Sequence, residues 1–340
     1  MHYLITGHTG FKGAWLTLWL TSLGHKVSGI SLDPIPGALF ETANLAELVE
    51  KDLRIDIRNA KETARAIKDI APDVVFHLAA QPLVRESYRD PRGTIETNVM
   101  GTLNVIEAVS ATPSVKAQVV VTTDKVYRNI NQEAGYVESD PLGGDDPYSA
   151  SKAMADILTH SWVTSFDSPP TTIVRAGNVI GGGDVSKDRL LPDLINSYLQ
   201  NKTPVLRYPD AVRPWQHVLD CLNGYLVISE NLLSGTEISE LNIGPDKDSF
   251  VTVGKVANLV ANELGSELNW KKDAGIHPHE AGLLALDASL AKDQFNWYNK
   301  LKFQDAIKWT TDWYKNVNSG KKPVDVSLNQ IESFKSLESV

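Results

Sequence analysis

Tyr148 and Lys152 are the first pair of residues whose types and spacing suit proton transfer. They stand four residues apart in DDPYSASK, where Pro147 can open a helix, and this spacing puts both side chains on one helix face. A lysine ammonium beside a phenol stabilises the phenolate, so the pair predicts a tyrosine that acts as a base near neutral pH. Because Tyr-x-x-x-Lys also occurs often on solvated helix faces, its meaning depends on the surrounding elements.

A second candidate site is VVVTTDKVY, an apolar run that ends in an acid and a base, Asp124 and Lys125. Consecutive side chains of a straight strand point to opposite faces, so both groups reach one substrate only if the chain leaves extended geometry there. An acid and a base in addition to a catalytic tyrosine predict an extra proton-transfer step. We expect the two groups to titrate as a coupled pair.

Short β-rich runs alternate with longer helical patterns over the first half of the chain. Near-continuous apolar strands predict a parallel sheet that is buried on both faces. The expected fold class is therefore α/β, a Rossmann-type doubly wound sheet. The expected strands are 2–6, 26–32, 73–79, 117–123 and 171–177, and the helices between them are 14–23, 60–70, 94–109 and 150–163.

Beyond about Asn178 the chain is richer in glycine, proline and charged loops, with amphipathic patterns over 190–200, 218–232 and 253–264. This change in composition and hydrophobic pattern predicts a smaller C-terminal substrate-binding lobe. The expected division is a Rossmann domain of 1–177 with 214–244 packing back onto it, a lobe of 178–213 and 245–316, and a poorly ordered tail of 317–340.

Composition excludes several classes of protein. A net charge of −9 over 340 residues argues against broad binding to nucleic acid or to an anionic membrane. The single cysteine, Cys221, excludes an intrachain disulfide framework and indicates a cytoplasmic protein, and the longest apolar run near the N-terminus is too short to span a bilayer. His217, His277 and His279 lack metal-ligand spacing with other ligands, so no metal is expected.

A glycine-rich loop, TGHTGFKG, follows the first strand and opens the first helix. Gly7, Gly10 and Gly13 there permit a tight turn and a close approach to a pyrophosphate at the helix N-terminus. Asp33, 20 residues after Gly13, can bond the ribose hydroxyls, and no arginine follows directly, so NAD is favoured over NADP. Asp33 could instead open the turn DPIPG, and Asp56 could meet the adenine amine or be an exposed strand-end acid.

Together the glycine loop, the apolar strand before Asp124 and the Tyr148/Lys152 pair resemble the extended short-chain dehydrogenase/reductase family. The resemblance implies that Tyr148 is the catalytic base and that Lys152 holds both the phenolate and the nicotinamide ribose of NAD. HLAAQ resembles the family's loop beside the cofactor, and Asn98 its helix-embedded asparagine. The other cofactor-binding residues that we expect are Gly7, Gly10, Phe11, Lys12, Gly13, Asp33, Asp56, Ile57, Leu78, Ala79 and Ala80.

A narrower resemblance is to the nucleotide-sugar 4,6-dehydratases that act on CDP-glucose. It is carried by TGHTGFKGAWL, AAQPLVRESY, TNVMGT, TTDKVY, GGDDPYSASK, VRAGNVIGGGD, KDRLLPD, RPWQHVLD and PHEAGLLALD. The implied reaction starts when Tyr148 takes the 4-hydroxyl proton as hydride passes from C4 to NAD, with Thr123 bonding the 4-oxygen. Lys125 then removes the C5 proton, Asp124 protonates the departing 6-hydroxyl, and hydride returns to C6.

Alternatives within this resemblance remain open. Many related hexose dehydratases carry Asp–Glu where this chain has Asp124 and Lys125, so the lysine resembles the cytidine branch or the UDP-N-acetylglucosamine dehydratases. The Val–Tyr step that follows is more typical of the wider dehydratase family than of the cytidine branch, where a cysteine is usual. A UDP-sugar 4-epimerase would not need the extra acid and base, and a non-catalytic NAD-binding sensor is an alternative of another class.

A nucleotide sugar brings two phosphate charges to an acidic protein, so local cations are required. The candidates are Arg189, Arg213 and Lys187, although each arginine alone is as often part of a surface salt bridge. The resemblance places Asn178 and Arg213 along the diphosphate, and we further expect Gln81 and His217 to contact the substrate. The expected partners are CDP-glucose and further copies of the chain, in a homodimer or homotetramer built on helices 94–109 and 150–163.

Overall fold

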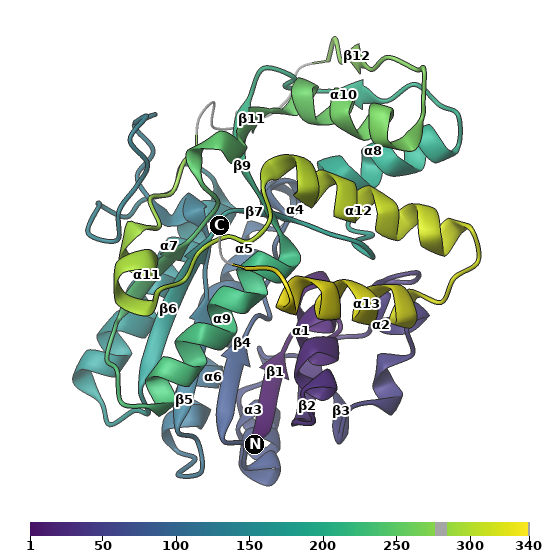
Figure 1. The fold of residues 1–340 in the computed structure, drawn as a ribbon. Helices are drawn as coiled ribbons and strands as arrows, with labels where there is room; N and C mark the ends of the chain where they lie inside the picture. Colours follow the sequence, from purple (N-terminus) through teal and green to yellow (C-terminus); the bar gives the residue numbers. More distant parts are fainter. Residues whose placement is uncertain (276–283, 339–340) are drawn as a thin grey trace.

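The computed structural model describes residues 1–275 and 284–338. Its central element is a seven-stranded sheet in which all neighbouring strands are parallel (Figure 1). This confirms the expected doubly wound α/β fold. In sheet order the strands are β10 (Glu240–Ile243), β6 (Thr171–Ala176), β5 (Ala117–Val121), β4 (Val74–His77), β1 (His2–Thr6), β2 (Lys26–Ser31) and β3 (Lys51–Arg54).

Helices cover both faces of this sheet because successive side chains of each buried strand point to opposite faces. Ile5 of β1 packs in the core shared with α1 (Phe11–Ser22), α9 (Val218–Leu233) and α13 (Pro323–Lys335). Leu4 packs in the core shared with α3 (Ala60–Ile70) and α6 (Gly101–Ser110), and α7 (Pro147–Ser165) lies beside α6. Strand order reverses between β1 and β4, which is where such sheets bind ligands.

The C-terminal lobe has a hydrophobic core of its own, above the sheet in Figure 1. Three helices build it around a small sheet of order β11-β9-β7 and a two-stranded pair. These elements are α8 (Leu190–Leu199), α10 (Val253–Leu264), α12 (Phe303–Asn318), β7 (Asn178–Ile180), β9 (Val212–His217), β11 (Phe250–Thr252), β8 (Val205–Leu206) and β12 (Lys271–Lys272).

Shorter elements complete the described chain. They are α2 (Leu39–Thr42), η1 (Leu45–Glu47), α4 (Val84–Arg89), α5 (Pro91–Ile95), the π-helical η2 (Glu96–Met100), η3 (Asp124–Val126), η4 (Lys247–Ser249) and α11 (Ser289–Phe295). The helix expected over 94–109 is therefore divided into α5, η2 and α6. Within the described ranges, no helix is both long and apolar enough to cross a membrane.

The C-terminal end differs from the expectation of a poorly ordered tail over 317–340, which is wrong for the helix α13. The buried Phe334 ring meets the Trp19 ring of α1 edge-on, with centroids 5.6 Å apart. The Trp313 indole of α12 donates a hydrogen bond to Ser327 Oγ at 2.9 Å. Apolar side chains on one face of α13 thus close the core over α1, and this burial orders the segment.

Candidate active site

A cavity of about 570 Å³ lies at the carboxyl ends of the strands, where the C-terminal lobe faces the main sheet. Residues after β5, from α4 and from α7 line one part of it, and residues of β7, α8, β8, β9 and neighbouring segments line another. Thr123, Lys125 and Tyr148 all line the cavity. The fold thus brings one residue of each predicted proton-transfer pair, Lys125 and Tyr148, to one space, while Asp124 and Lys152 are buried and do not line it.

The turn after β5 explains how adjacent residues can act together. β5 ends at Val121, and the 3₁₀ turn η3 begins at Asp124, so the chain leaves extended geometry at this acid. Lys125 Nζ donates to Asp124 Oδ1 at 3.2 Å, and Thr123 Oγ1 donates to the same oxygen at 2.9 Å. Asp124 is fully buried, and its Oδ2 has no hydrogen-bond partner among the described residues. An unsatisfied buried carboxylate oxygen is typical of a functional site.

Tyr148 and Lys152 lie on α7, which Asp146 caps and Pro147 opens as expected. Burial raises the pKa of Tyr148 to about 12, although a hydrogen bond with Thr123 acts in the opposite direction. Burial, reinforced by the positive charge of Lys12, lowers the pKa of Lys152 to about 7. The expected lowering of the tyrosine pKa is therefore absent from this structure, because desolvation has the largest effect on Tyr148 and Lys152 Nζ donates instead to Val121 O at 2.8 Å.

The glycine loop fits a dinucleotide. Gly7 adopts a φ of +77°, and a Cβ there would lie 2.8 Å from Ala79 N. A Cβ on Gly13 would overlap the carbonyl oxygen of Gly7. No side chain caps the N-terminus of α1 at Gly10, so its backbone N–H groups are available for a pyrophosphate. The close approach of backbone segments explains why the loop requires glycine at these positions.

Other predicted cofactor residues surround this loop. Leu78 and Ala79 follow β4, with Ala79 N donating to Thr6 Oγ1 at 3.3 Å, and Ala80 comes next in the same segment. The buried Ile57 side chain packs against Gly101. Phe11 packs against the core at the start of α1, and the next residue, Lys12, turns inward. Lys12 Nζ donates to Tyr225 Oη at 2.9 Å, and burial lowers the pKa of this lysine.

The two acids predicted near the adenosine are both paired with arginines. Asp33 is exposed just beyond β2, and its Oδ1 lies 3.3 Å from Arg54 Nε. This arginine is separated from Asp33 by 21 residues and reaches it only because β2 and β3 are neighbours. Asp56 binds Arg58, and hydrogen bonds from this guanidinium lower the pKa of Asp56. The pairing of Asp33 with Arg54 is not visible as a local sequence pattern, whereas Asp56 and Arg58 are only two residues apart.

Asn98 and Gln81 form a structural link rather than contacts with the cavity. Asn98 Oδ1 accepts from Gln81 N at 2.7 Å, and Asn98 Nδ2 donates to Ser151 Oγ of α7 at 2.8 Å. The Gln81 side chain donates to Thr94 Oγ1 and accepts from Leu83 N. The loop after β4 is thereby fastened to α7. Gln81, which we predicted to contact the substrate, does not line the cavity.

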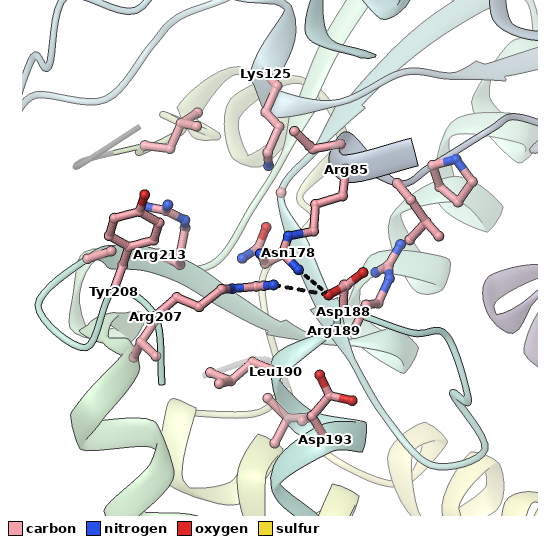
Figure 2. Close-up of a pocket in the computed structure, with 18 of the residues that line it drawn as sticks. Arg85, Lys125, Asn178, Asp188, Arg189, Leu190, Asp193, Arg207, Tyr208 and Arg213 are labelled. Carbon is pink, nitrogen blue, oxygen red and sulfur yellow. Dashed lines mark hydrogen bonds and ion pairs between the residues drawn. The ribbon is translucent and has the colours of Figure 1, made fainter. Parts of the chain in front are cut away.

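A group of cations lines the wall opposite the turn of Thr123, Asp124 and Lys125 (Figure 2). Arg189, Arg213 and Asn178 lie there as the sequence predicts. Sequence reasoning missed Arg85 of α4 and Arg207, which follows β8. Their Nη1 atoms donate to Asp188 Oδ1 at 2.9 and 3.0 Å. Arg85 stands in AAQPLVRESY, directly after the predicted cofactor loop. This position in the sequence could have identified Arg85 as a candidate site residue.

Lys187 and His217, which we predicted to contact substrate, are not among the residues that line this cavity. Lys187 is exposed elsewhere. His217 is fully buried, and its Nδ1 accepts from Leu219 N, which caps α9. Within the described residues no cluster of potential metal ligands occurs, and His277 and His279 lie outside the described ranges.

Burial lowers the pKa of His217 to about 3, which predicts an acid-dependent loss of stability. The imidazole is neutral in the folded protein and protonates near pH 6.5 when unfolded, so stability present above pH 6.5 is lost as the pH falls. Between pH 7 and pH 5 this group lowers the free energy of unfolding by about 2 kcal/mol. Denaturant titrations at several pH values should show that the free energy of unfolding falls less between pH 7 and pH 5 in His217→Asn than in the wild type. Asparagine retains a helix-capping acceptor at this position. Equal slopes in the two proteins would contradict the argument.

Comparison with known proteins agrees with this geometry. Residues 3–244 match the model of the NAD dependent epimerase/dehydratase family. The chain belongs to that family. It is 40% identical to the CDP-glucose 4,6-dehydratase of Salmonella typhimurium over 343 aligned residues, covering 98% of this chain and 95% of the relative.

Solved structures share the fold. A dTDP-glucose 4,6-dehydratase from Streptomyces venezuelae with NAD bound is 25% identical, with a TM-score of 0.81 and coverage of 95% of this chain and 100% of that one. A UDP-glucose 4-epimerase from Thermotoga maritima is 21% identical, with a TM-score of 0.83 and coverage of 94% of this chain and 100% of that one. At this identity the comparison supports only a shared fold. NAD is the cofactor of this family, and the loop of Gly7 and Gly13 fits its pyrophosphate.

Proposed function

We propose that this protein is a nucleotide-sugar 4,6-dehydratase that converts CDP-glucose to CDP-4-keto-6-deoxyglucose. The observation that carries the proposal is the contact between Asp124 and Lys125 on the turn after β5, beside the cavity that Tyr148 also lines. The relative that shares 40% of its sequence is a CDP-glucose 4,6-dehydratase, which supports the choice of nucleotide sugar.

Each group then has a distinct task. NAD held by the loop of Gly7 and Gly13 would supply the hydride acceptor for C4 and the hydride donor for C6. Tyr148 Oη takes the proton of the 4-hydroxyl, and Thr123 Oγ1 bonds the 4-oxygen. A ketone at C4 acidifies the C5–H bond, so Lys125 Nζ as the neutral amine can remove that proton.

Asp124 completes the elimination. As the protonated acid it donates its proton to the departing 6-hydroxyl, so that water leaves and a C5–C6 double bond forms. Lys125 is then an ammonium and Asp124 a carboxylate. Once C6 has received its hydride, the resulting C4–C5 enolate takes a proton at C5 from the Lys125 ammonium, which restores the neutral amine. Tyr148 then loses to solvent the proton that it took from the 4-hydroxyl, and Asp124, whose Oδ1 lies 3.2 Å from Lys125 Nζ, regains one.

Isotopic labelling tests this proposal. With CDP-glucose that carries deuterium at C4, the proposed reaction moves the label into the C6 methyl group, since the same hydride is taken from C4 and returned at C6. Mass spectrometry and NMR of the product would locate it. A product that keeps the 6-hydroxyl and has inverted C4 would identify an epimerase instead.

The rival functions make different demands on the site. A UDP-sugar 4-epimerase needs the tyrosine and NAD but no further acid and base, so it leaves Asp124 and Lys125 without a task. A UDP-N-acetylglucosamine dehydratase would use the same catalytic groups on another nucleotide sugar. A non-catalytic NAD-binding sensor would require none of these side chains to face a cavity of about 570 Å³.

The cationic wall is proposed to bind the substrate diphosphate. Arg207→Ala should raise the KM for CDP-glucose about 10-fold to 100-fold and change kcat little, because a charged hydrogen bond contributes about 1.5–3 kcal/mol. Steady-state kinetics provide the measurement. Arg65→Ala removes an arginine that is 84% exposed on α3 and serves as the matched control. An unchanged KM in Arg207→Ala would place the diphosphate elsewhere.

We also propose that the protein forms a homodimer or a larger homo-oligomer. Several apolar side chains are exposed on contacting elements, namely Tyr88, Ile95, Met100, Met154 and Ile157. Since apolar patches of this kind mark association surfaces, Ile157→Glu should shift the sedimentation velocity to that of a monomer. Ile130→Glu, on a loop distant in sequence and 68% exposed, is the control. A monomeric wild-type protein would refute this proposal.

A further inference from the structure

Arg175 is a charged residue within the apolar strand β6 and is only 3% exposed. Burying a guanidinium is costly unless it is paired and hydrogen-bonded. Arg175 Nε donates to Asp156 Oδ2 at 2.9 Å, and Nη2 donates to Asp156 Oδ1 at 2.7 Å. Burial alone lowers the pKa of Arg175, but these bonds outweigh it and leave the pKa raised. The two-bond geometry orients both groups firmly.

The same guanidinium holds the far end of the catalytic turn. Arg175 Nη1 donates to Tyr127 Oη at 3.0 Å, and Tyr127 Oη donates to Asn242 Oδ1 at 2.7 Å. The Tyr127 ring stacks on Tyr136, with centroids 5.2 Å apart. Tyr127 is the residue that ends the turn η3, so these contacts fix the position at which the turn stops.

The near end of the turn is attached to the same carboxylate. Thr122 Oγ1 donates to Asp156 Oδ2 at 3.0 Å, directly before Thr123 and Asp124. Asp156 lies four residues beyond Lys152 and eight beyond Tyr148 on α7, on the same helix face. Thr122, Asp156 and Arg175 do not line the cavity, whereas Tyr127 does, so Thr122→Val is the variant that tests positioning without changing the cavity lining.

We infer that Arg175, Asp156, Thr122 and Tyr127 are positioning residues that hold the turn of Asp124 and Lys125 in register with the helix of Tyr148 and Lys152. This inference rests on the proposed dehydratase function. The network sets the distance between the groups that oxidise C4 and the groups that eliminate water. Loosening it should therefore impair elimination more than C4 oxidation, because Tyr148 and Lys152 are held by α7 itself.

Two conservative variants test the network, each at one end of the turn. Tyr127→Phe removes the hydroxyl and keeps the stacked ring, while Thr122→Val removes the other hydroxyl at nearly constant volume. Each should lower kcat about tenfold with KM unchanged within about a factor of two, since small misplacements of catalytic groups slow reactions strongly. The kinetic isotope effect with deuterium at C5 should rise, and the effect with deuterium at C4 should not.

A second measurement does not depend on activity. Hydrogen exchange followed by mass spectrometry should show the peptide of residues 120–130 exchanging about fivefold faster in each variant, as expected when one net hydrogen bond is lost. Peptides from α7 should exchange as in the wild type. A general loss of folding would accelerate exchange in both places.

Matched controls remove buried hydroxyls elsewhere. Tyr198→Phe lies in the core of the C-terminal lobe, and Thr159→Val removes a hydroxyl on α7 that donates only to its own helix, at Ala155 O. Both should retain wild-type kinetics and wild-type exchange over residues 120–130. Unchanged exchange in Tyr127→Phe and Thr122→Val, or a lower kcat without a larger C5 isotope effect, would overturn the inference. If the wild type releases no water from a nucleotide sugar, the proposed function fails, and exchange over 120–130 still decides whether the network holds the turn.

Discussion

Replacing Lys125 by alanine is expected to stop water elimination while leaving the protein able to oxidise C4. The amine is the base assigned to the C5 proton, and loss of a general base typically costs about 10²-fold to 10⁴-fold in rate. Because Tyr148 and Lys152 lie on a separate element, α7, the first half of the reaction retains its groups. Absorbance of reduced cofactor should therefore build up during turnover in Lys125→Ala, while release of water nearly ceases.

The control for this substitution is Lys68→Ala, at an exposed lysine of α3 that does not line the cavity. Lys125→Met offers a second form of the test, because it keeps much of the side-chain volume and packing while removing the charge. Wild-type rates of water release in both Lys125 variants would reduce the contact of Lys125 with Asp124 to a structural ion pair.

Replacing Tyr148 by phenylalanine is expected to block the reaction before C4 is oxidised. Tyr148 is 9% exposed and lines the cavity, so the substitution removes one hydroxyl from a packed site without opening it. The expected loss in kcat is about 10²-fold to 10⁴-fold, with no accumulation of reduced cofactor. Stopped-flow absorbance distinguishes this pattern from that of Lys125→Ala.

Binding provides the control for the tyrosine variant. Calorimetric titration should show that Tyr148→Phe binds NAD within a few-fold of the wild type, because the glycine loop is untouched. Reduced cofactor that forms at the wild-type rate in Tyr148→Phe would remove this residue from the chemistry. A sensor protein, by contrast, would be indifferent to the substitution.

The fold and the proposed catalytic residues were largely accessible to sequence reasoning because their signals are local. Apolar strands, the glycine loop and the four-residue spacing of Tyr148 and Lys152 each lie within a short segment. The Asp124 and Lys125 pair even indicated where a strand must end, and β5 does end just before it.

The remainder depends on contacts between distant segments. Arg85 and Arg207 meet at Asp188 only when the C-terminal lobe folds over the sheet, and Arg54 reaches Asp33 only through the pairing of neighbouring strands. The pKa of Tyr148 could not be derived from its spacing to Lys152, since burial decides it. Likewise, α13 is ordered by its packing on α1, which depends on tertiary structure.

Substrate specificity provides the most direct measurement of the central claim. The purified protein would be incubated separately with CDP-glucose, UDP-glucose, dTDP-glucose and UDP-N-acetylglucosamine. Mass spectrometry would then measure the molecular mass of each product. The account predicts loss of one water from CDP-glucose, much faster than from the other three, and no loss in Lys125→Ala. Absence of water loss from all four, with NAD bound, would contradict the dehydratase assignment.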